Sequence, residues 1–212
     1  TFPMAKDYKR IGDGDTGLNT GGMGAVSPVP FADEKFCKAI QDTIIKPTID
    51  GLKKDKIPYV GFVFVGLIRV GDLPYVIEYN VRMGDPETQV VLPRIKNDLA
   101  EMLYYTAIGK LDQVELIVED KSATTVVAVS GGYPEAYEKG KIITGLPSST
   151  DTKIFHAGTI IKQGEILTNG GRVLAVTSLA DDDKKALEKS YQILNKIGFE
   201  GMYFRKDIGF DL

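Results

Sequence analysis

The sequence Val76-Ile77-Glu78-Tyr79-Asn80-Val81-Arg82 predicts a β-strand with one polar face. Apolar residues stand at 77, 79 and 81, and Glu78, Asn80 and Arg82 alternate with them. Side chains of a strand point to opposite faces with a period of two, so the three polar groups share a face. A rise of about 3.3 Å per residue puts the Cα atoms of Glu78 and Asn80 roughly 6.6 Å apart.

The polar face of this strand has the chemistry of a metal and phosphate site. Mg²⁺ takes oxygen ligands, usually one or two carboxylates together with phosphate oxygens, and Glu78 and Asn80 offer such oxygens at a suitable spacing. Arg82 adds a planar fork that suits a carboxylate or a phosphate. The alternative is the solvent-facing side of an antiparallel strand, which needs no ligand. These residues alone leave both interpretations open.

The rest of the chain predicts helices and antiparallel hairpins around this strand. An apolar run over 60–70 and the strand over 75–82 flank a turn, which indicates a hairpin. Apolar residues at 36, 40 and 44 predict a helix that begins after Asp33 and that Pro47 breaks or kinks near Lys46, and a second helix is expected from Asp98 to Gly109. Beyond about residue 121, short strands separated by glycine turns precede a helix. We therefore expect an α+β fold in two domains, 1–118 and 119–212.

Composition excludes several classes of protein. Hydrophobic residues make up 43% of the 212 residues and charged residues 26%, which is typical of a globular protein. The formal net charge of −3 argues against a nucleic-acid surface. No apolar stretch approaches the roughly 20 residues of a membrane span. The single cysteine, Cys37, cannot form an intramolecular disulfide, which suits a reducing cytoplasm.

Several motifs together resemble one family. Glycine-rich Asp13–Gly24 and the Met83–Gln89 run that follows the strand resemble the second half of the ATP-grasp domain of phosphoribosylamine–glycine ligases. The resemblance covers nearly the whole chain, because further family motifs occur in order at Ser130–Pro134, Phe155–Thr159, Thr168–Leu174 and Phe204–Gly209. It implies an ATP-grasp C-terminal subdomain, an antiparallel sheet with helices, followed by a small mixed α+β domain. Since the chain starts at Thr1, we expect it to be the C-terminal piece of a longer protein and inactive alone.

The resemblance also implies a reaction. Family members are ligases that form a C–N bond between glycine and 5-phosphoribosylamine at the expense of ATP, through glycyl phosphate. The products are glycinamide ribonucleotide, ADP and phosphate, in purine biosynthesis. We accordingly expect ATP as co-substrate, Mg²⁺ or Mn²⁺ as cofactor, and a monomeric, cytoplasmic full-length enzyme that binds neither nucleic acid nor a membrane.

Site residues can be carried over from the family by position. The resemblance makes Glu78 and Asn80 metal ligands and Arg82 a catalytic residue that holds an anion. It assigns phosphates of ATP to Lys9 and Arg10. The substrate-binding residues that it implies are Asn19, Thr20, Gly21, Gly22, Met23, Gly24, Asp85 and Thr88.

Each assignment has an alternative that needs no ligand. Arg82 would instead form a structural salt bridge with Asp85, Lys9 and Arg10 would be solvated charges, and the glycine-rich segment would be a plain surface loop. His156 is expected to be structural, as a lone histidine in a strand usually is. We interpret Arg172 and the group Arg205–Asp207 as contacts between domains.

Two other functions remain open at this point. The chain could belong to another ATP-grasp carboxylate–amine ligase of the purine pathway, although the run over 84–89 argues against that. It could also be a binding module that kept the fold and lost turnover. Intact Glu78, Asn80 and Arg82 argue against such a loss.

Overall fold

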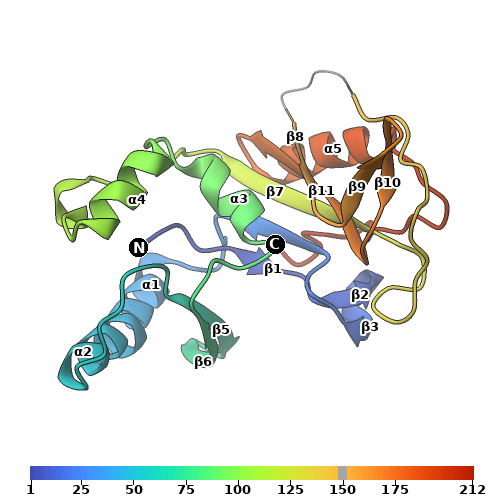
Figure 1. Cartoon of the computed structure of the whole chain (residues 1–212). Coiled ribbons are helices and arrows are strands. Elements are labelled where there is room, and N and C mark those ends of the chain that lie inside the picture. The colour runs from blue at the N-terminus through green and yellow to red at the C-terminus, as the bar shows by residue number, and fades with distance from the viewer. Residues whose placement is uncertain (148–151) are drawn as a thin grey trace. The chain divides into compact units, whose positions relative to one another are not determined.

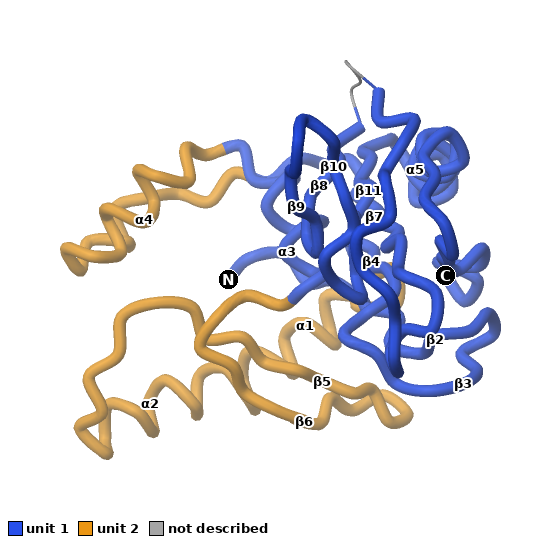
Figure 2. Tube along the Cα trace, turned by 45° about the vertical axis from the view of Figure 1, so that its right-hand side comes forward, with its two compact units in different colours: residues 1–28, 85–96, 118–212 blue, residues 29–84, 97–117 orange. Residues whose placement is uncertain are grey.

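The computed structural model describes residues 1–147 and 152–212, and these form two compact units (Figures 1 and 2). Unit 1 consists of residues 1–28, 85–96 and 118–212, and unit 2 of residues 29–84 and 97–117. The units are therefore interleaved along the chain and do not follow the division expected at 118 and 119. That division into domains stays a prediction, because a compact unit and a domain of common descent need not coincide.

Unit 1 is built on a five-stranded sheet in the order β1-β4-β7-β11-β8, with every neighbouring pair antiparallel. The bounds of these strands are Lys6–Asp7 (β1), Gly24–Ser27 (β4), Ser122–Val129 (β7), Arg172–Ala180 (β11) and Lys153–His156 (β8). Every residue of β7 is buried, which requires cover on both faces of the sheet. Helix α5 (Asp183–Leu194) packs on β7 and β11, and the short helix α3 (Thr88–Val91) packs on β4, β7 and β11.

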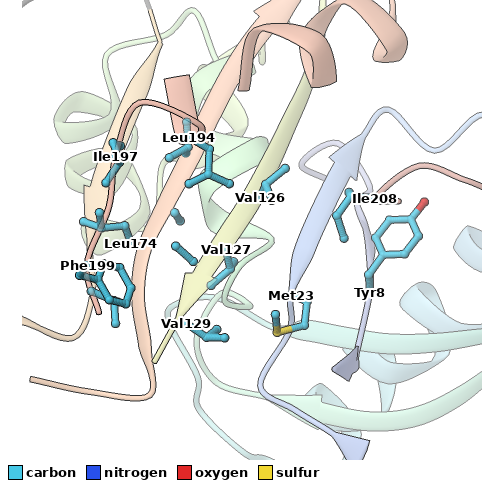
Figure 3. Close-up of a cluster of buried hydrophobic side chains, with 14 of the residues drawn as sticks. Tyr8, Met23, Val126, Val127, Val129, Leu174, Leu194, Ile197, Phe199 and Ile208 are labelled. Carbon is cyan, nitrogen blue, oxygen red and sulfur yellow. The ribbon is translucent and has the colours of Figure 1, made fainter. Parts of the chain in front are cut away.

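The hydrophobic core of unit 1 contains residues from both the N-terminal segment and the C-terminal half of the chain. Leu174 and Leu194 come from β11 and α5, while Tyr8 and Met23 come from the N-terminal segment (Figure 3). Tyr8 is 1% exposed and Met23 is fully buried. Burial of a large apolar side chain contributes roughly 1.5–3 kcal/mol, so the N-terminal residues are a substantial part of this core.

Two smaller hairpins complete unit 1. Strands β2 (Arg10–Gly12) and β3 (Thr16–Asn19) flank a 3-10 turn over Asp13–Asp15, and β9 (Thr159–Lys162) pairs with β10 (Glu165–Thr168). A further 3-10 turn over Leu92–Arg94 follows α3. The expected α+β class, with antiparallel sheet and helices, is confirmed.

Unit 2 contains one long helical segment, a two-stranded hairpin and a separate helix. The helical segment comprises α1 (Glu34–Ile40), a π-helical turn over Gln41–Ile45 and α2 (Lys46–Lys54). The hairpin pairs β5 (Phe64–Val70) with β6 (Leu73–Asn80), and α4 (Leu99–Ala107) precedes a 3-10 turn over Leu111–Gln113. As predicted, the side chains of Asp33 and Asp98 cap α1 and α4.

The helix does not break at Pro47, where the sequence had predicted a break or a kink near Lys46. The backbone stays helical from α1 through the π-helical turn into α2, and Pro47 lies in the first turn of α2. A proline ring normally clashes with the carbonyl four residues earlier in a helix. A π-helical turn immediately before it widens the backbone, and such bulges are one of the ways in which a helix passes an obstacle.

The buried guanidinium of Arg205, in the C-terminal segment, binds the turn between β2 and β3. The Arg205 side chain is fully buried, and its Nη1 donates to Asp15 Oδ1 at 2.5 Å. Its Nε and Nη2 donate to the two carboxylate oxygens of Asp207 at 2.8 Å each. The rings of Tyr8 and Phe210 lie 5.4 and 5.8 Å from Arg205 Cζ. A charge this deep is stable only because it is paired with carboxylates and hydrogen-bonded to them.

The same network perturbs its acidic partner. Burial by itself raises the pKa of Asp207, but hydrogen bonds from Arg205 and from the Gly14 N–H outweigh it and lower the pKa to about 2. Conversely, burial of Arg205 lowers the pKa of its guanidinium, and the hydrogen bonds to Asp207 and Asp15 reverse that shift. Both groups therefore remain charged in the folded protein.

We predict that Arg205→Met lowers the free energy of unfolding by roughly 3 kcal/mol, because it leaves two carboxylates without their shared cation. Lys206→Met is the matched control, since Lys206 is an exposed neighbour, and we expect it to change stability by less than about 0.5 kcal/mol. Urea unfolding of the three proteins measures the effect. Equal stability of the two variants would contradict the role of the buried network.

A second prediction concerns pH. The pKa of Asp207 lies near 2 in the folded protein, below its ordinary value of 3.8, so its contribution to stability is present above about pH 4 and is lost as pH falls towards 2. The difference in unfolding free energy between the wild type and Asp207→Asn should therefore be constant above about pH 5 and shrink from pH 4 to pH 2. Urea unfolding at several pH values measures this difference, and a difference that did not change with pH would contradict it.

Candidate functional site

The predicted metal ligands lie side by side on β6 in unit 2. Glu78 is paired with Gly66 of β5, and Asn80 with Phe64. Asn80 Nδ2 donates to Glu78 Oε1 at 3.1 Å, which confirms that the two side chains share one face of the strand. A Cβ added at Gly66 would lie 2.9 Å from Glu78 Cγ, so the glycine makes room for the glutamate to lie across β5.

This pair fits a magnesium ion only as part of a larger ligand set. Among residues 1–147 and 152–212, no group of three or more His, Cys, Asp or Glu side chains is placed to hold a metal. Mg²⁺ is commonly held by one or two protein oxygens, with water and substrate phosphates completing the octahedron. Since the Asn80 amide directs its N–H towards Glu78, its carbonyl oxygen is the atom that would meet a metal. The residues present therefore fit a metal that arrives with a nucleotide.

The sequence had predicted Arg82 within the strand, but Arg82 lies two residues beyond its end. Strand β6 ends at Asn80, and Arg82 is exposed and donates from Nη1 to the Met83 carbonyl at 2.9 Å. The Tyr59 hydroxyl donates to the carbonyls of Phe62 and Val81 at 2.6 and 3.3 Å, which holds the backbone immediately before Arg82. The local bond uses one of the five guanidinium donors.

In unit 1, the segment Asn19–Gly24 is tightly bound to its surroundings. The Thr20 N–H donates to the Lys9 carbonyl at 2.7 Å, and the Gly22 N–H donates to the Thr20 hydroxyl at 2.9 Å. The Met23 N–H donates to the Tyr8 carbonyl at 2.7 Å. These N–H groups are satisfied within the protein, so they are not available to bind an anionic substrate. The assignment of residues 19–24 to a substrate stays a prediction, to be met by side chains and carbonyls.

Two residues that the sequence analysis did not assign to the site hold this loop. Tyr133 accepts the Gly21 N–H on its hydroxyl at 2.9 Å. Arg172 Nη1 donates to the carbonyls of Gly21 and Asp85 at 2.8 and 2.7 Å. Both residues lie in the family motifs noted above, and Arg172 had been expected to form a contact between domains. Sequence gave no indication of its partners, because they lie 87 and 151 positions away.

Thr88 is the first residue of α3, and Asp85 lies three residues before it. Both carboxylate oxygens of Asp85 are engaged, Oδ2 by Arg172 Nη2 at 3.1 Å and Oδ1 by Gln89 Nε2 at 2.8 Å. The ion pair of Asp85 is thus with Arg172, whereas the sequence had offered Arg82 as the alternative. The Asp85 side chain is 52% exposed, so it can still meet a ligand.

Local contacts also engage the two basic residues that were predicted to bind phosphates. Arg10 Nη1 donates to the Gly17 carbonyl at 2.8 Å, within the β2–β3 hairpin. Lys9 Nζ lies 3.5 Å from Asp7 Oδ2, and its side chain is 55% exposed. Burial and then the charge of Asp7 raise the pKa of the nearby Glu87 carboxyl, and Lys9 opposes the shift. The assignment of Lys9 and Arg10 to ATP stays a prediction.

The comparisons with known proteins agree on one family. The model of the phosphoribosylglycinamide synthetase ATP-grasp (A) domain matches residues 1–88, and the model of the C domain of the same synthetase matches residues 123–211. A bifunctional purine biosynthetic protein of Pichia angusta is 52% identical over 98% of this chain and 27% of its own length. A phosphoribosylamine–glycine ligase of Chlorobaculum tepidum is 46% identical over 98% of this chain and 50% of its own length.

Solved structures give the same result for the fold. The crystal structure of a phosphoribosylamine–glycine ligase from Thermotoga maritima matches with a TM-score of 0.88 and 38% identity, over 97% of this chain and 51% of that one. A biotin carboxylase from Campylobacter jejuni matches with a TM-score of 0.61 at 16% identity, over 85% of this chain and 40% of its own, which shows a shared fold alone. The chain spans about half the length of the single-function relatives that it matches. Among the described residues, no helix is long and apolar enough to cross a membrane.

We predict that Gly22→Ala destabilises the protein by roughly 3 kcal/mol or more, because its φ is +115° and an added Cβ would lie 2.3 Å from Pro86 Cδ. Gly14→Ala is the matched control. Gly14 also has a positive φ, +66°, but an added Cβ would meet nothing within 4 Å, so we expect a cost of about 1 kcal/mol. Urea unfolding compares the two, and a Gly22→Ala variant no less stable than Gly14→Ala would show that the loop can move away from Pro86.

Proposed function

Because the chain belongs to the phosphoribosylglycinamide synthetase family, we propose that it is part of a phosphoribosylamine–glycine ligase of purine biosynthesis. The full-length protein would join glycine to 5-phosphoribosylamine and convert ATP to ADP and phosphate. The pair of Glu78 and Asn80 on one face of β6, followed by Arg82, is the observation that carries this proposal.

The reaction takes place in two displacements. An oxygen of the glycine carboxylate attacks the γ-phosphorus of ATP, the bond to the β–γ bridging oxygen breaks, and ADP leaves with the electron pair. The amine nitrogen of phosphoribosylamine then attacks the acyl carbon of glycyl phosphate, loses a proton and displaces phosphate. Such phosphoryl transfer depends mainly on positioning and on neutralising oxygen charge, so it needs no nucleophilic serine or cysteine.

The residues of this chain divide that work between them. Glu78 and Asn80 would hold Mg²⁺ or Mn²⁺, which when bound neutralises charge on the phosphate oxygens of ATP. Arg82 would hold an anionic oxygen, of the glycine carboxylate or of the transferring phosphoryl group, for which a guanidinium fork is suited. Asn19–Gly24, Asp85 and Thr88 would line the substrate, and Lys9 and Arg10 would meet phosphates of ATP.

We also propose the setting in which the ligase works. One cysteine in 212 residues suits a reducing cytoplasm, and a net charge of −3 argues against binding of nucleic acid. We expect the full-length enzyme to be a monomer, which sedimentation of the purified protein would test.

The metal assignment can be tested directly. In the full-length protein we predict that Glu78→Gln lowers kcat/KM by roughly 100-fold and raises the Mg²⁺ concentration for half-maximal rate, since an amide is a weaker ligand than a carboxylate. Release of ADP with glycine and phosphoribosylamine, titrated with Mg²⁺, measures both.

Asp72→Asn is the matched control on the same hairpin. Asp72 is 81% exposed, and its replacement leaves the contacts of Arg69 with the Phe31 and Phe36 rings in place, so the Mg²⁺ titration should stay as in the wild type. A Glu78→Gln enzyme with an unaltered titration would refute the assignment of the metal, and a wild type that forms no glycinamide ribonucleotide would refute the proposed function.

A further inference from the structure

Arg172 connects two segments that are far apart in sequence. It is the first residue of β11, and its Nη1 donates to the carbonyls of Gly21 and Asp85 while its Nη2 donates to Asp85 Oδ2. The guanidinium is therefore hydrogen-bonded both to the glycine-rich loop and to Asp85, three residues before α3. Its side chain is only 22% exposed, so solvent screens these bonds less than it would on an open surface.

Tyr133 fixes the same loop through a different group. Its hydroxyl accepts the Gly21 N–H, so Gly21 is held through its N–H by Tyr133 and through its carbonyl by Arg172. The Tyr133 ring lies against Gly171, where an added Cβ would be 2.2 Å from Cδ2. Gly171 immediately precedes Arg172, so the two side chains that hold Gly21 are anchored next to each other at the start of β11.

The loop can approach Arg172 and Pro86 this closely only because Gly21 and Gly22 have no side chains. A Cβ added at Gly21 would lie 3.0 Å from Arg172 Cζ, and one added at Gly22 would lie 2.3 Å from Pro86 Cδ. The loop therefore packs directly on the guanidinium and on the Asp85–Pro86 segment. Hydrogen bonds from Gln89 and Arg172 to the two oxygens of Asp85 fix the orientation of that carboxylate as well.

We propose that Arg172 is a positioning residue of the ligase, which holds the Gly21–Gly22 turn and the Asp85 carboxylate in the geometry that the amine substrate requires. The proposal rests on the proposed function. The exposed Asp85 carboxylate accepts hydrogen bonds, and phosphoribosylamine offers an amine and ribose hydroxyls as donors. The metal pair is on a different element, β6, so loss of Arg172 should affect the amine substrate and leave the Mg²⁺ dependence unchanged.

The hydrogen bonds of the Arg172 side chain distinguish arginine from lysine at this position. Three acceptors around one side chain require the planar, multidentate guanidinium, whereas an ammonium group is a compact point charge. Arg172→Lys keeps the positive charge beside Asp85 and loses the fork. If the role is the fork, lysine does not restore function; if the role is only charge, it does.

The test uses the full-length protein as wild type, Arg172→Lys, Arg172→Gln and the control Lys162→Gln, which removes an exposed charge on β9. Phosphoribosylamine is generated in the assay from ribose 5-phosphate and ammonia. We expect both Arg172 variants to raise the KM for the amine by roughly tenfold or more, the size associated with loss of charge-assisted hydrogen bonds. The KM for ATP and the Mg²⁺ concentration for half-maximal rate should stay within about twofold of wild type.

Amide hydrogen exchange gives a readout that does not depend on the reaction. Peptides that cover residues 19–24 should exchange faster in Arg172→Gln than in wild type or Lys162→Gln. If these peptides exchange at the wild-type rate in Arg172→Gln, Arg172 does not hold the loop. Wild-type KM values in Arg172→Lys, or a fall of every kinetic parameter in parallel with thermal stability, overturn the positioning role. If the wild type forms no glycinamide ribonucleotide, the proposed function and the amine assignment fail together, while exchange still decides whether Arg172 holds the loop.

Discussion

The antiparallel pairing of β4 with β7 is the interaction on which the arrangement of unit 1 depends. Residues 24–27 align with residues 123–126, so a strand from the segment that matches the ATP-grasp domain lies in the sheet of the segment that matches the C domain. Gly24 makes this possible, because an added Cβ would lie 2.7 Å from the Thr125 carbonyl oxygen. The Val127 N–H also donates to the Met23 carbonyl at 2.9 Å. The glycine-rich loop therefore ends inside the core, and its position is set by the sheet.

Two arginines from the C-terminal half of the chain then hold the N-terminal hairpin at two points. Arg205 binds the turn between β2 and β3 from a fully buried position, and Arg172 binds the loop that follows β3 from a partly exposed one. A buried and fully paired charge such as Arg205 acts chiefly on stability and on the uniqueness of the structure. A partly exposed charge beside an exposed carboxylate remains accessible to a ligand. Arg172 and Arg205 had been expected to connect domains; in the structure each binds partners within unit 1, and the expectation stays a prediction together with the division into domains.

Sequence was informative where structure depends on near neighbours along the chain. The alternation over 76–82 predicted a shared face for Glu78 and Asn80, and Asp33 and Asp98 predicted helix starts, because a strand face and a cap are set by residues two or three positions apart. The order β1-β4-β7-β11-β8 could not be predicted in this way, since it pairs strands about 100 residues apart. The same limit applied to Tyr133 and Arg172, whose partners at Gly21 are set by that order. The continuation of the helix past Pro47 was missed for a different reason, because the π-helical turn before Pro47 accommodates a residue that usually ends a helix.

The metal pair and the substrate segments are held in physically different ways. Residues 20–24 and 85–88 are attached to a five-stranded sheet with a hydrophobic core, which gives them a firm base. Glu78 and Asn80 lie on a two-stranded hairpin, and an isolated hairpin of this kind is marginally stable at best. Unit 2 supports it by side-chain contacts: the Tyr79 hydroxyl lies 2.9 Å from Thr48 Oγ1 of α2, and Arg69 stacks on the rings of Phe31 and Phe36. Because catalysis by positioning requires placement within a fraction of an ångström, these few contacts matter as much for the metal pair as the sheet does for the substrate loop. Tyr79 and Arg69 touch no ligand in the proposed mechanism, yet on this argument they are as necessary to the geometry of the metal pair as Arg172 is to that of the loop.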